Sequence, residues 1–194
     1  DYGSHQIFDS IKRLIDIIFG FIGLLVFVVT FPIVALAIKV TSAGEVIFSQ
    51  ERVGQNGKTF VLYKYRTMSS SSASNTWTSP GDSRITGLGK ILRKFRVDEL
   101  PQAINIIRGD MSIVGPRPEQ VNIVQKLEEE IPYYTERHSV KPGLTGWAQL
   151  HVYAGSVEES RQKLQYDLYY IKHRNLVFDL EILVKTFYNI ITFS

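Results

Sequence analysis

The chain has 194 residues, enough for one domain with its own core and a membrane element besides. It contains no cysteine, which excludes disulfides, cysteine-ligated zinc and thiol catalysis, and its four histidines without an HExxH spacing argue against a zinc hydrolase. A net charge of +3 suits an anionic partner, such as a phosphate ligand or a lipid surface, and gives no reason to expect nucleic acid. The first five residues, DYGSH, resemble the remnant of a cloning tag, and we set them aside.

An uncharged apolar run over residues 17–38, IIFGFIGLLVFVVTFPIVALAI, predicts a membrane-associated helix. At a rise of ~1.5 Å per residue, it is long enough to cross a hydrocarbon core of ~30 Å. No small-residue cleavage site follows the run, which argues against a cleaved signal peptide.

Both flanks of this run are basic, with Lys12 and Arg13 before it and Lys39 after it. The positive-inside rule assigns basic flanks to the cytoplasm, and Pro32 removes a backbone donor, which favours a kink or break. These residues leave two topologies open: a straight span with a mild kink, or a re-entrant helix that dips into one leaflet. We also expect Asp16 to pair with Lys12, one helical turn away.

The soluble part begins with a predicted β-hairpin over residues 45–60. Its QNGK segment carries the Asn-Gly turn signal, and alternating apolar residues flank it. The segment of residues 68–82, MSSSSASNTWTSPGD, is a polar loop for which a lid and plain disorder are both open.

Helical patterns dominate the rest of the chain. We expect one helix at residues 87–95 and a second that runs from an N-cap at Asp98 to a C-terminal Gly109. Three further helices are expected at residues 118–130, 156–173 and 179–193. The last of these is amphipathic, so it packs in the core or lies on the bilayer interface. Residues 141–149, KPGLTGWAQ, are expected to form a loop. The predicted fold class is α+β, mostly helical.

Asp98 and Glu99 stand side by side in the stretch FRVDELPQAINIIRGDMSIVGPRPE. Neighbouring side chains on a helix diverge by about 100°, so the pair cannot act as two facing carboxylates. If the two groups do chemistry, they must do two different jobs. The plain alternative is that they cap a helix, whose positive end would lower the pKa of Asp98.

Basic residues surround this pair in the sequence. Arg117 is held between two prolines and is preorganised for phosphate binding. Phosphoryl transfer needs a nucleophile, cations and Mg²⁺; an ionised aspartate can attack phosphorus, and a second carboxylate can hold the metal. Our candidate phosphate ligands are Arg66, Arg93 and Arg117, with Lys64, Lys94 and Arg96 as further cations.

These motifs resemble the signature of the bacterial sugar transferases, the monotopic polyprenol-phosphate phosphoglycosyl transferases. By that resemblance Asp98 would be the nucleophile, Glu99 the Mg²⁺ ligand and Lys64 an essential lysine near the diphosphate. Arg93 matches an arginine near the polyprenol phosphate, and Arg117 a phosphate-binding arginine. The resemblance covers nearly the whole chain, through KRLID, FSQERVGQNGKTFVLYKYRTM, DSRITGLGKILRK, the Asp-Glu stretch, RHSVKPGLTGWAQL and KLQYDLYYIKH.

The resemblance implies an enzyme that moves a sugar phosphate from a UDP-sugar to a polyprenol phosphate and releases UMP, through a covalent aspartyl phosphosugar. Such enzymes start exopolysaccharide, O-antigen or capsule synthesis. It also implies a re-entrant helix at residues 6–40, broken near Pro32, and a catalytic domain at residues 41–194 on the cytoplasmic face of the bacterial inner membrane. Membrane lipid, a UDP-sugar and polyprenol phosphate are the expected partners.

Two departures from the family pattern stand out. Phe31 precedes the proline where many members have serine, so Thr30 would have to cap the freed carbonyls. The segment after TGWAQ resembles the larger exopolysaccharide-priming members, which carry an extra N-terminal membrane region, so we expect this chain to be the catalytic half of a longer protein.

Two alternatives to this function remain. Within the enzyme class, the lipid phosphate attacks the UDP-sugar directly and Asp98 only orients it. Outside that class, the chain is a catalytically idle membrane scaffold for polysaccharide assembly. The sequence leaves the sugar and the oligomeric state open, a homo-oligomer included.

Overall fold

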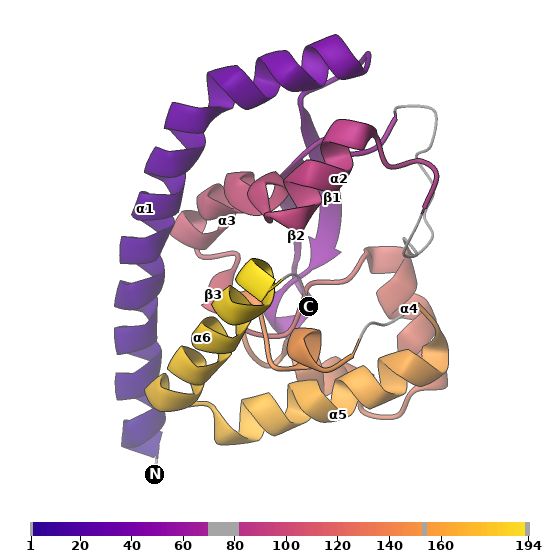
Figure 1. Cartoon of the computed structure of the whole chain (residues 1–194). Helices are drawn as coiled ribbons and strands as arrows, with labels where there is room; N and C mark the ends of the chain where they lie inside the picture. The colour runs from indigo at the N-terminus through magenta and orange to yellow at the C-terminus, as the bar shows by residue number, and fades with distance from the viewer. Residues whose placement is uncertain (1, 70–81, 153–154, 193–194) are drawn as a thin grey trace.

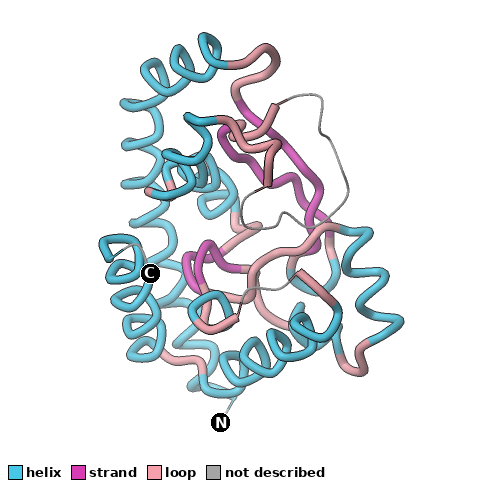
Figure 2. Tube along the Cα trace, turned by 45° about the vertical axis from the view of Figure 1, so that its right-hand side comes forward, coloured by secondary structure: helices cyan, strands magenta, loops and turns pink. Residues whose placement is uncertain are grey.

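The computed structural model describes residues 2–69, 82–152 and 155–192, so most of the loop expected at residues 68–82 lies outside the described residues. This part is mostly helical with two small two-stranded sheets, which confirms the α+β class (Figure 2). The helices are α1 (Tyr2–Thr41), α2 (Gly87–Lys94), α3 (Ala103–Arg108), α4 (Val121–Glu130), α5 (Val157–His173) and α6 (Leu176–Thr192). The strands are β1 (Ile47–Val53), β2 (Thr59–Tyr65), β3 (Ser112–Val114) and β4 (Gly143–Thr145), and short 3-10 helices include η3 (Val97–Gln102) and η5 (Ala148–Leu150).

Helix α1 runs along one side of the domain and bends toward its C-terminal end (Figure 1). Pro32 lies inside the helix, where a proline removes an N–H donor and crowds the carbonyl four residues earlier. The Thr30 hydroxyl donates to the carbonyls of Val26 (2.7 Å) and Phe27 (3.3 Å), a contact that often bends helices. The carbonyl that loses its donor to Pro32 is that of Val28, so Thr30 binds the carbonyls one and two residues before it and does not make the expected cap.

The inner face of α1 packs closely on the domain. A Cβ atom on Gly20 would lie 3.0 Å from the Ile107 side chain, so the small residue lets α1 approach α3. Farther along, the rings of Phe27 and Phe31 lie 5.6 Å and 6.2 Å from the ring of Tyr65, which ends β2. The bent part of α1 is therefore held against the hairpin by aromatic packing.

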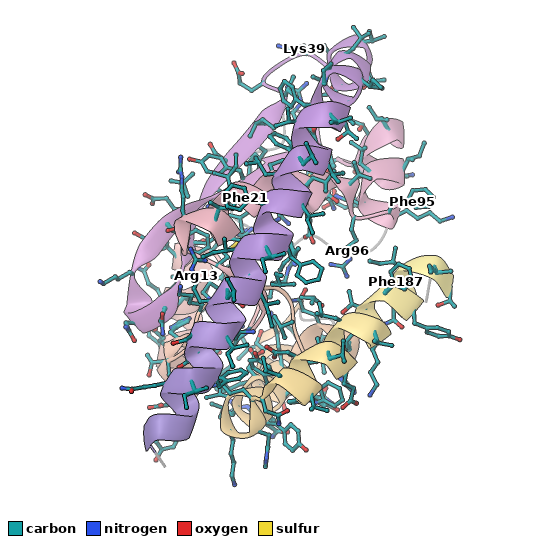
Figure 3. All side chains as sticks on the ribbon, turned by 90° about the vertical axis from the view of Figure 1, so that its left-hand side faces the viewer. Arg13, Phe21, Lys39, Phe95, Arg96 and Phe187 are labelled. Atoms are coloured by element: carbon teal, nitrogen blue, oxygen red, sulfur yellow. The ribbon has the colours of Figure 1, made fainter. Side chains whose placement is uncertain are left out.

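The outer face of α1 is apolar and exposed along its length, with Leu25, Val29 and Ile33 exposed to 66%, 67% and 74%. Within the described residues, α1 is the one helix long and apolar enough to cross a membrane, by length and composition. Figure 3 looks onto this side of the molecule, where Phe21 of α1, Phe95 after α2 and Phe187 of α6 are labelled. We call the exposed apolar side chains of α1, α2 and α6 on this side the apolar face.

Polar residues near the start of α1 bind the rest of the domain instead of each other. Lys12 pairs with Asp179 of α6 at 2.5 Å. Asp16 is 3% exposed and accepts hydrogen bonds from the Ser112 hydroxyl (3.0 Å) and the Ile113 N–H (2.9 Å). The predicted Lys12–Asp16 pair is therefore wrong, because a buried carboxylate takes the donors that β3 presents to it.

The hairpin of β1 and β2 follows the sequence signal. The strands are antiparallel, with Val53 opposite Thr59. Asn56 and Gly57 have φ of 55° and 74°, the left-handed pair that a type I′ turn requires. β2 extends to Tyr65, beyond the predicted end at residue 60, and so carries Lys64 on a regular strand.

A second sheet, which we did not expect, joins β3 and β4 in parallel. A Cβ atom on Gly143 would lie 2.1 Å from the Gly115 nitrogen, and one on Gly146 would lie 2.1 Å from the Gly115 oxygen. Only glycines fit there, because the two backbones touch. The glycines of KPGLTGW thus let residues 141–149, which we expected to form a loop, pack directly against the Gly-Pro-Arg-Pro turn (residues 115–118).

The helix ends were predicted with mixed success. Gly109 ends α3 with φ 89°, as expected, and α5 begins after Ser156, whose side chain caps it. α4 begins at Val121 rather than at residue 118. α6 begins earlier than residue 179, because Asn175 caps it by accepting from the Phe178 N–H (2.9 Å).

Candidate active site

Asp98 and Glu99 lie in the first turn of η3, just after a left-handed residue. Arg96, with φ 55° and ψ 19°, ends the run of α2 and turns the chain into η3. Arg96 occupies the N-cap position and its side chain makes no capping hydrogen bond. Our prediction that Asp98 is the N-cap is therefore wrong. Both carboxylates are instead buried, at 7% and 6% exposure.

The Glu99 carboxylate is surrounded by cations from three separate segments. Its Oε1 lies 3.1 Å from Lys64 Nζ and 2.8 Å from Arg117 Nη2. Its Oε2 lies 3.4 Å from Arg96 Nη1. Burial alone would raise the pKa of Glu99, but these three charges outweigh burial and hold that pKa well below its usual value. Glu99 is therefore ionised, and we call these four residues the Glu99 cluster.

Asp98 has very different surroundings. Among the residues that the structure describes, none donates a hydrogen bond to its carboxylate. Burial and the neighbouring Glu99 charge raise the pKa of Asp98, against the opposing charges of Lys64, Arg93 and Arg117. This corrects the expected lowering by a helix dipole, because η3 is a 3-10 helix of only six residues and the carboxylate is buried beside a second anion. Two adjacent carboxylates with separated pKa values are suited to different tasks.

Lys64 is placed by its strand, and the strand is fixed by Asn105 of α3. The Asn105 amide accepts from the Tyr63 N–H (3.3 Å) and donates to the Val61 carbonyl (2.7 Å), so it pairs with β2 as another strand would. Burial, followed by the nearby Arg117 charge, lowers the pKa of Lys64 to about 8, although Glu99 opposes this. Asn105 was missed from the sequence, where the available signal was one amide among the isoleucines of AINIIR.

Arg117 connects the Glu99 cluster to the loop after β4. Its Nη1 donates to Gln149 Oε1 (3.1 Å), while its Nη2 binds Glu99. The backbone of the turn is held from behind, since Arg137 Nη2 donates to the Arg117 carbonyl (2.9 Å) and Arg52 Nη1 to the Pro118 carbonyl (3.1 Å). Gln149, Arg137 and Arg52 were also missed, although the polar residues of TGWAQ and RHSVKPG offered a signal.

Of the other two candidate phosphate ligands, Arg93 lies near Asp98 and Arg66 does not. Arg93 is near enough to oppose the raised pKa of Asp98, and its Nε donates to the Thr67 hydroxyl (2.8 Å). Arg66 does not join them. It follows the end of β2, and its Nη2 donates to the backbone oxygen (2.8 Å) and hydroxyl (3.0 Å) of Ser42, just beyond α1.

Few groups here are suited to a metal ion. In the described ranges, no three His, Cys, Asp or Glu side chains gather. Mg²⁺, however, is usually held by one or two carboxylates with substrate phosphates and water. Among the described residues, Glu99 Oε2 contacts only Arg96, at 3.4 Å, so Glu99, with Asp98 beside it, fits such a partial ligand set.

Several known proteins resemble the chain. A family model described as bacterial sugar transferase matches residues 7–193. The chain is 43% identical over 189 residues to the UDP-N-acetylgalactosamine-undecaprenyl-phosphate N-acetylgalactosaminephosphotransferase of Aeromonas hydrophila, covering 96% of this chain and 45% of that protein. It is 39% identical over 181 residues to the UDP-glucose:undecaprenyl-phosphate glucose-1-phosphate transferase of Escherichia coli K12, covering 91% and 39%.

A shorter relative matches over nearly its whole length. The exopolysaccharide production protein PSS of Rhizobium leguminosarum is 38% identical over 185 residues, covering 91% of this chain and 92% of that protein. The chain thus spans less than half of the first two relatives and nearly all of the third.

Proposed function

We propose, because the chain belongs to the bacterial sugar transferase family, that it transfers a sugar phosphate from a UDP-sugar to a polyprenol phosphate and releases UMP. The names of the relatives from Aeromonas and Escherichia support this substrate pair. A role at the start of polysaccharide synthesis agrees with the name of the Rhizobium relative.

The proposed reaction has two displacements at one phosphorus. The Asp98 carboxylate attacks the phosphorus that carries the sugar, and the bond to the bridging oxygen breaks, so that UMP leaves with the electron pair. An oxygen of the polyprenol phosphate then attacks the same phosphorus, and the Asp98 carboxylate leaves. The observation that carries this proposal is a buried carboxylate to which no described residue donates a hydrogen bond, beside a second carboxylate whose charge is neutralised.

The surrounding cations have a clear part in this scheme. Lys64 and Arg117 are 19% and 32% exposed, so a diphosphate can reach them while they still contact Glu99. Their charges stabilise the charge that develops on the phosphoryl oxygens and on the leaving UMP. When bound, Mg²⁺ held by Glu99 and the diphosphate would supply further neutralisation of that charge.

Direct attack by the lipid phosphate is the weaker alternative. In that mechanism Asp98 would only orient the substrate, yet an ionised carboxylate accepts hydrogen bonds only and has no donor with which to hold a phosphate. An idle scaffold would have no use for four cations, Lys64, Arg93, Arg96 and Arg117, around two buried carboxylates.

We also propose that α1 is re-entrant, with the domain on the cytoplasmic face of the inner membrane. The same domain holds both ends of α1, through the Asp9–Arg174 pair (2.6 Å) and through Ile38, which packs with Tyr65 and Leu92. A straight span would break one of these contacts. Single cysteines at Gln6→Cys and Ser42→Cys should label from the cytoplasmic side only; outside labelling of position 6 would refute the re-entrant helix.

The reaction itself is tested by incubating the protein, in detergent with polyprenol phosphate and Mg²⁺, with a panel of UDP-sugars. We expect UMP to be released with one or a few of the UDP-sugars. Without the lipid, the protein should release UMP in its first turnover and only traces of UMP after that. If no UDP-sugar yields UMP, the transferase proposal fails and the scaffold alternative gains support.

A further inference from the structure

Arg93 is held differently from the other arginines near the candidate active site. Arg96 and Arg117 both contact the carboxylate of Glu99. Arg93 instead donates from its Nε to the hydroxyl of Thr67 (2.8 Å), which is a neutral acceptor. In the part of the chain that the structure describes, the Arg93 side chain makes no ion pair and no other hydrogen bond. A neutral hydroxyl therefore orients this guanidinium without cancelling its charge.

Thr67 is itself fixed where the chain after β2 meets α2. It is 5% exposed and lies two residues beyond the end of β2. Its carbonyl accepts a hydrogen bond from the N–H of Thr86, the N-cap residue of α2 (3.0 Å). A Cβ atom on Gly89 would lie 2.1 Å from the Thr67 carbonyl oxygen, so a glycine is needed for α2 to pack against this backbone. The hydroxyl that holds Arg93 is therefore carried by a backbone with little freedom to move.

The segment that carries Thr67 also carries a cation of the Glu99 cluster. Lys64 lies three residues before Thr67 and contacts Glu99 (3.1 Å). Arg93 comes from α2, on a different part of the chain, and its charge acts on Asp98. The bond between Thr67 and Arg93 thus ties a cation of α2 to the strand that positions Lys64.

The geometry of a guanidinium explains what such a bond achieves. With its Nε–H bound, Arg93 keeps both terminal nitrogens for a ligand. A guanidinium held in one plane can meet a phosphate through two parallel hydrogen bonds. A side chain that is ordered before the ligand binds loses less conformational entropy on binding, and the ligand binds more tightly.

We propose that Thr67 is a positioning residue of the transfer reaction: its hydroxyl orients the Arg93 guanidinium toward a substrate phosphate at Asp98 and leaves the charge of Arg93 uncompensated. The proposal rests on the transferase function proposed above. Thr67 acts only through Arg93, so loss of its hydroxyl should weaken what Arg93 does and nothing else. The phosphate belongs either to the donor diphosphate or to the acceptor lipid, and the experiment separates these two sources.

The test is a double-mutant cycle of Thr67→Val and Arg93→Ala. Valine keeps the branched shape of threonine and removes the hydroxyl, whereas alanine at position 93 removes the guanidinium. Two quantities are measured for each protein: the rate of the UMP burst from UDP-sugar without acceptor, and the KM for polyprenol phosphate in multiple turnover. A slower burst in Arg93→Ala means that the guanidinium serves the donor diphosphate, and a higher acceptor KM means that it serves the lipid phosphate.

We expect Thr67→Val to change the same quantity as Arg93→Ala, in the same direction, by about tenfold, on the scale of one hydrogen bond to a charged group. In the Arg93→Ala background it should have little further effect, because no guanidinium is left to orient. Thr67→Ser keeps the hydroxyl and should restore the values of the unmodified protein. The matched control is Thr59→Val, at the exposed start of β2, which should change neither quantity.

Three results would overturn the proposal: unchanged kinetics in Thr67→Val, an equal effect of Thr67→Val with and without Arg93, or no recovery in Thr67→Ser. If Thr67→Val does not fold, Thr67→Ala takes its place in the cycle. An unmodified protein that releases no UMP would refute the transferase function instead. The cycle is then measured on the affinity for inorganic pyrophosphate, where the same coupling is expected and its absence would refute the role of Thr67.

Discussion

Two buried charge clusters lie on opposite sides of the Gly-Pro-Arg-Pro turn, and they differ in exposure. Behind the turn, Arg137 and Asp167 are 2.8 Å apart, and both side chains are only 2% exposed. In front of it, the Glu99 cluster pairs a 7% exposed carboxylate with Arg117 and Arg96 side chains that are 32% and 42% exposed. The rear pair is closed to any ligand, whereas the front cations are still accessible.

From this difference in exposure we infer that the Arg137–Asp167 pair stabilises the fold and that the Glu99 cluster binds substrate. A closed ion pair leaves an uncompensated buried charge when one partner is removed. Glu99 has three cationic partners, so it tolerates the loss of one, and their exposed faces can contact an anionic substrate. Arg137 also bonds the carbonyl of Arg117, so the rear cluster positions the front one.

The largest effect on folding is expected for Arg137→Ala. It should lower the free energy of unfolding by about 3–5 kcal/mol, because Asp167 is left buried and unpaired. Thermal unfolding in a fixed detergent measures this, with the exposed Arg161→Ala as control. A full loss of activity at an unchanged melting temperature would contradict the structural role.

Arg117→Ala should show the reverse pattern. We expect a loss of about 2–4 kcal/mol in kcat/KM, the scale of a charge-assisted contact made in the transition state. The melting temperature should change little, since Lys64 and Arg96 still compensate Glu99. If melting temperature and activity fall together, Arg117 merely braces the turn.

Glu99→Gln tests the proposed metal ligand. We expect the Mg²⁺ concentration for half-maximal activity to rise about tenfold and kcat to fall, without unfolding. Glu119→Gln is the matched control, because Glu119 pairs with Lys163 behind the turn and should affect stability instead. An unchanged Mg²⁺ titration in Glu99→Gln would mean that the metal is held elsewhere.

A smaller effect is expected on the pH profile. The pKa of Lys64 is lowered to about 8 by burial, so kcat/KM should fall as the pH rises above about 8 and this cation is lost. Lys64→Arg should move that decline to higher pH, if the arginine is accepted. A profile that is the same in both proteins would exclude Lys64 as the titrating group.

Unfolding does not explain that expected decline. The pKa of Lys64 is lower in the folded protein than in an unfolded chain, where lysine titrates near about 10.4. Between these values the folded protein binds fewer protons, so this group makes the free energy of unfolding rise with pH. Melting temperatures measured across the same range separate the two effects.

Local signals in the sequence were read correctly where one residue type fixes the backbone. The Asn-Gly turn and Gly109 both depend on neighbours a few residues away. Asp98 was misplaced because a 3-10 turn that starts from a left-handed arginine has no sequence pattern of its own. The β3–β4 pair was missed because three-residue strands are too short to show alternation.

The grouping of the candidate residues was predicted partly from neighbouring charges in the sequence and, for Lys64, from the family resemblance. Asp98, Glu99, Lys64 and Arg117 do lie together, and Arg93 is close by. Contacts between distant segments could not be read from spacing: Lys12 binds Asp179, and Arg66 binds Ser42. Their partners are chosen by burial and proximity in the fold.

The most direct test of the account is the mass of the protein after incubation with a reactive UDP-sugar and Mg²⁺, without acceptor. If Asp98 is the nucleophile, the protein should gain the mass of one sugar phosphate and lose it when polyprenol phosphate is added. Asp98→Asn should form no adduct and show no turnover, since a neutral amide is not a nucleophile. An adduct on Asp98→Asn, or turnover without any adduct in the unmodified protein, would contradict the mechanism.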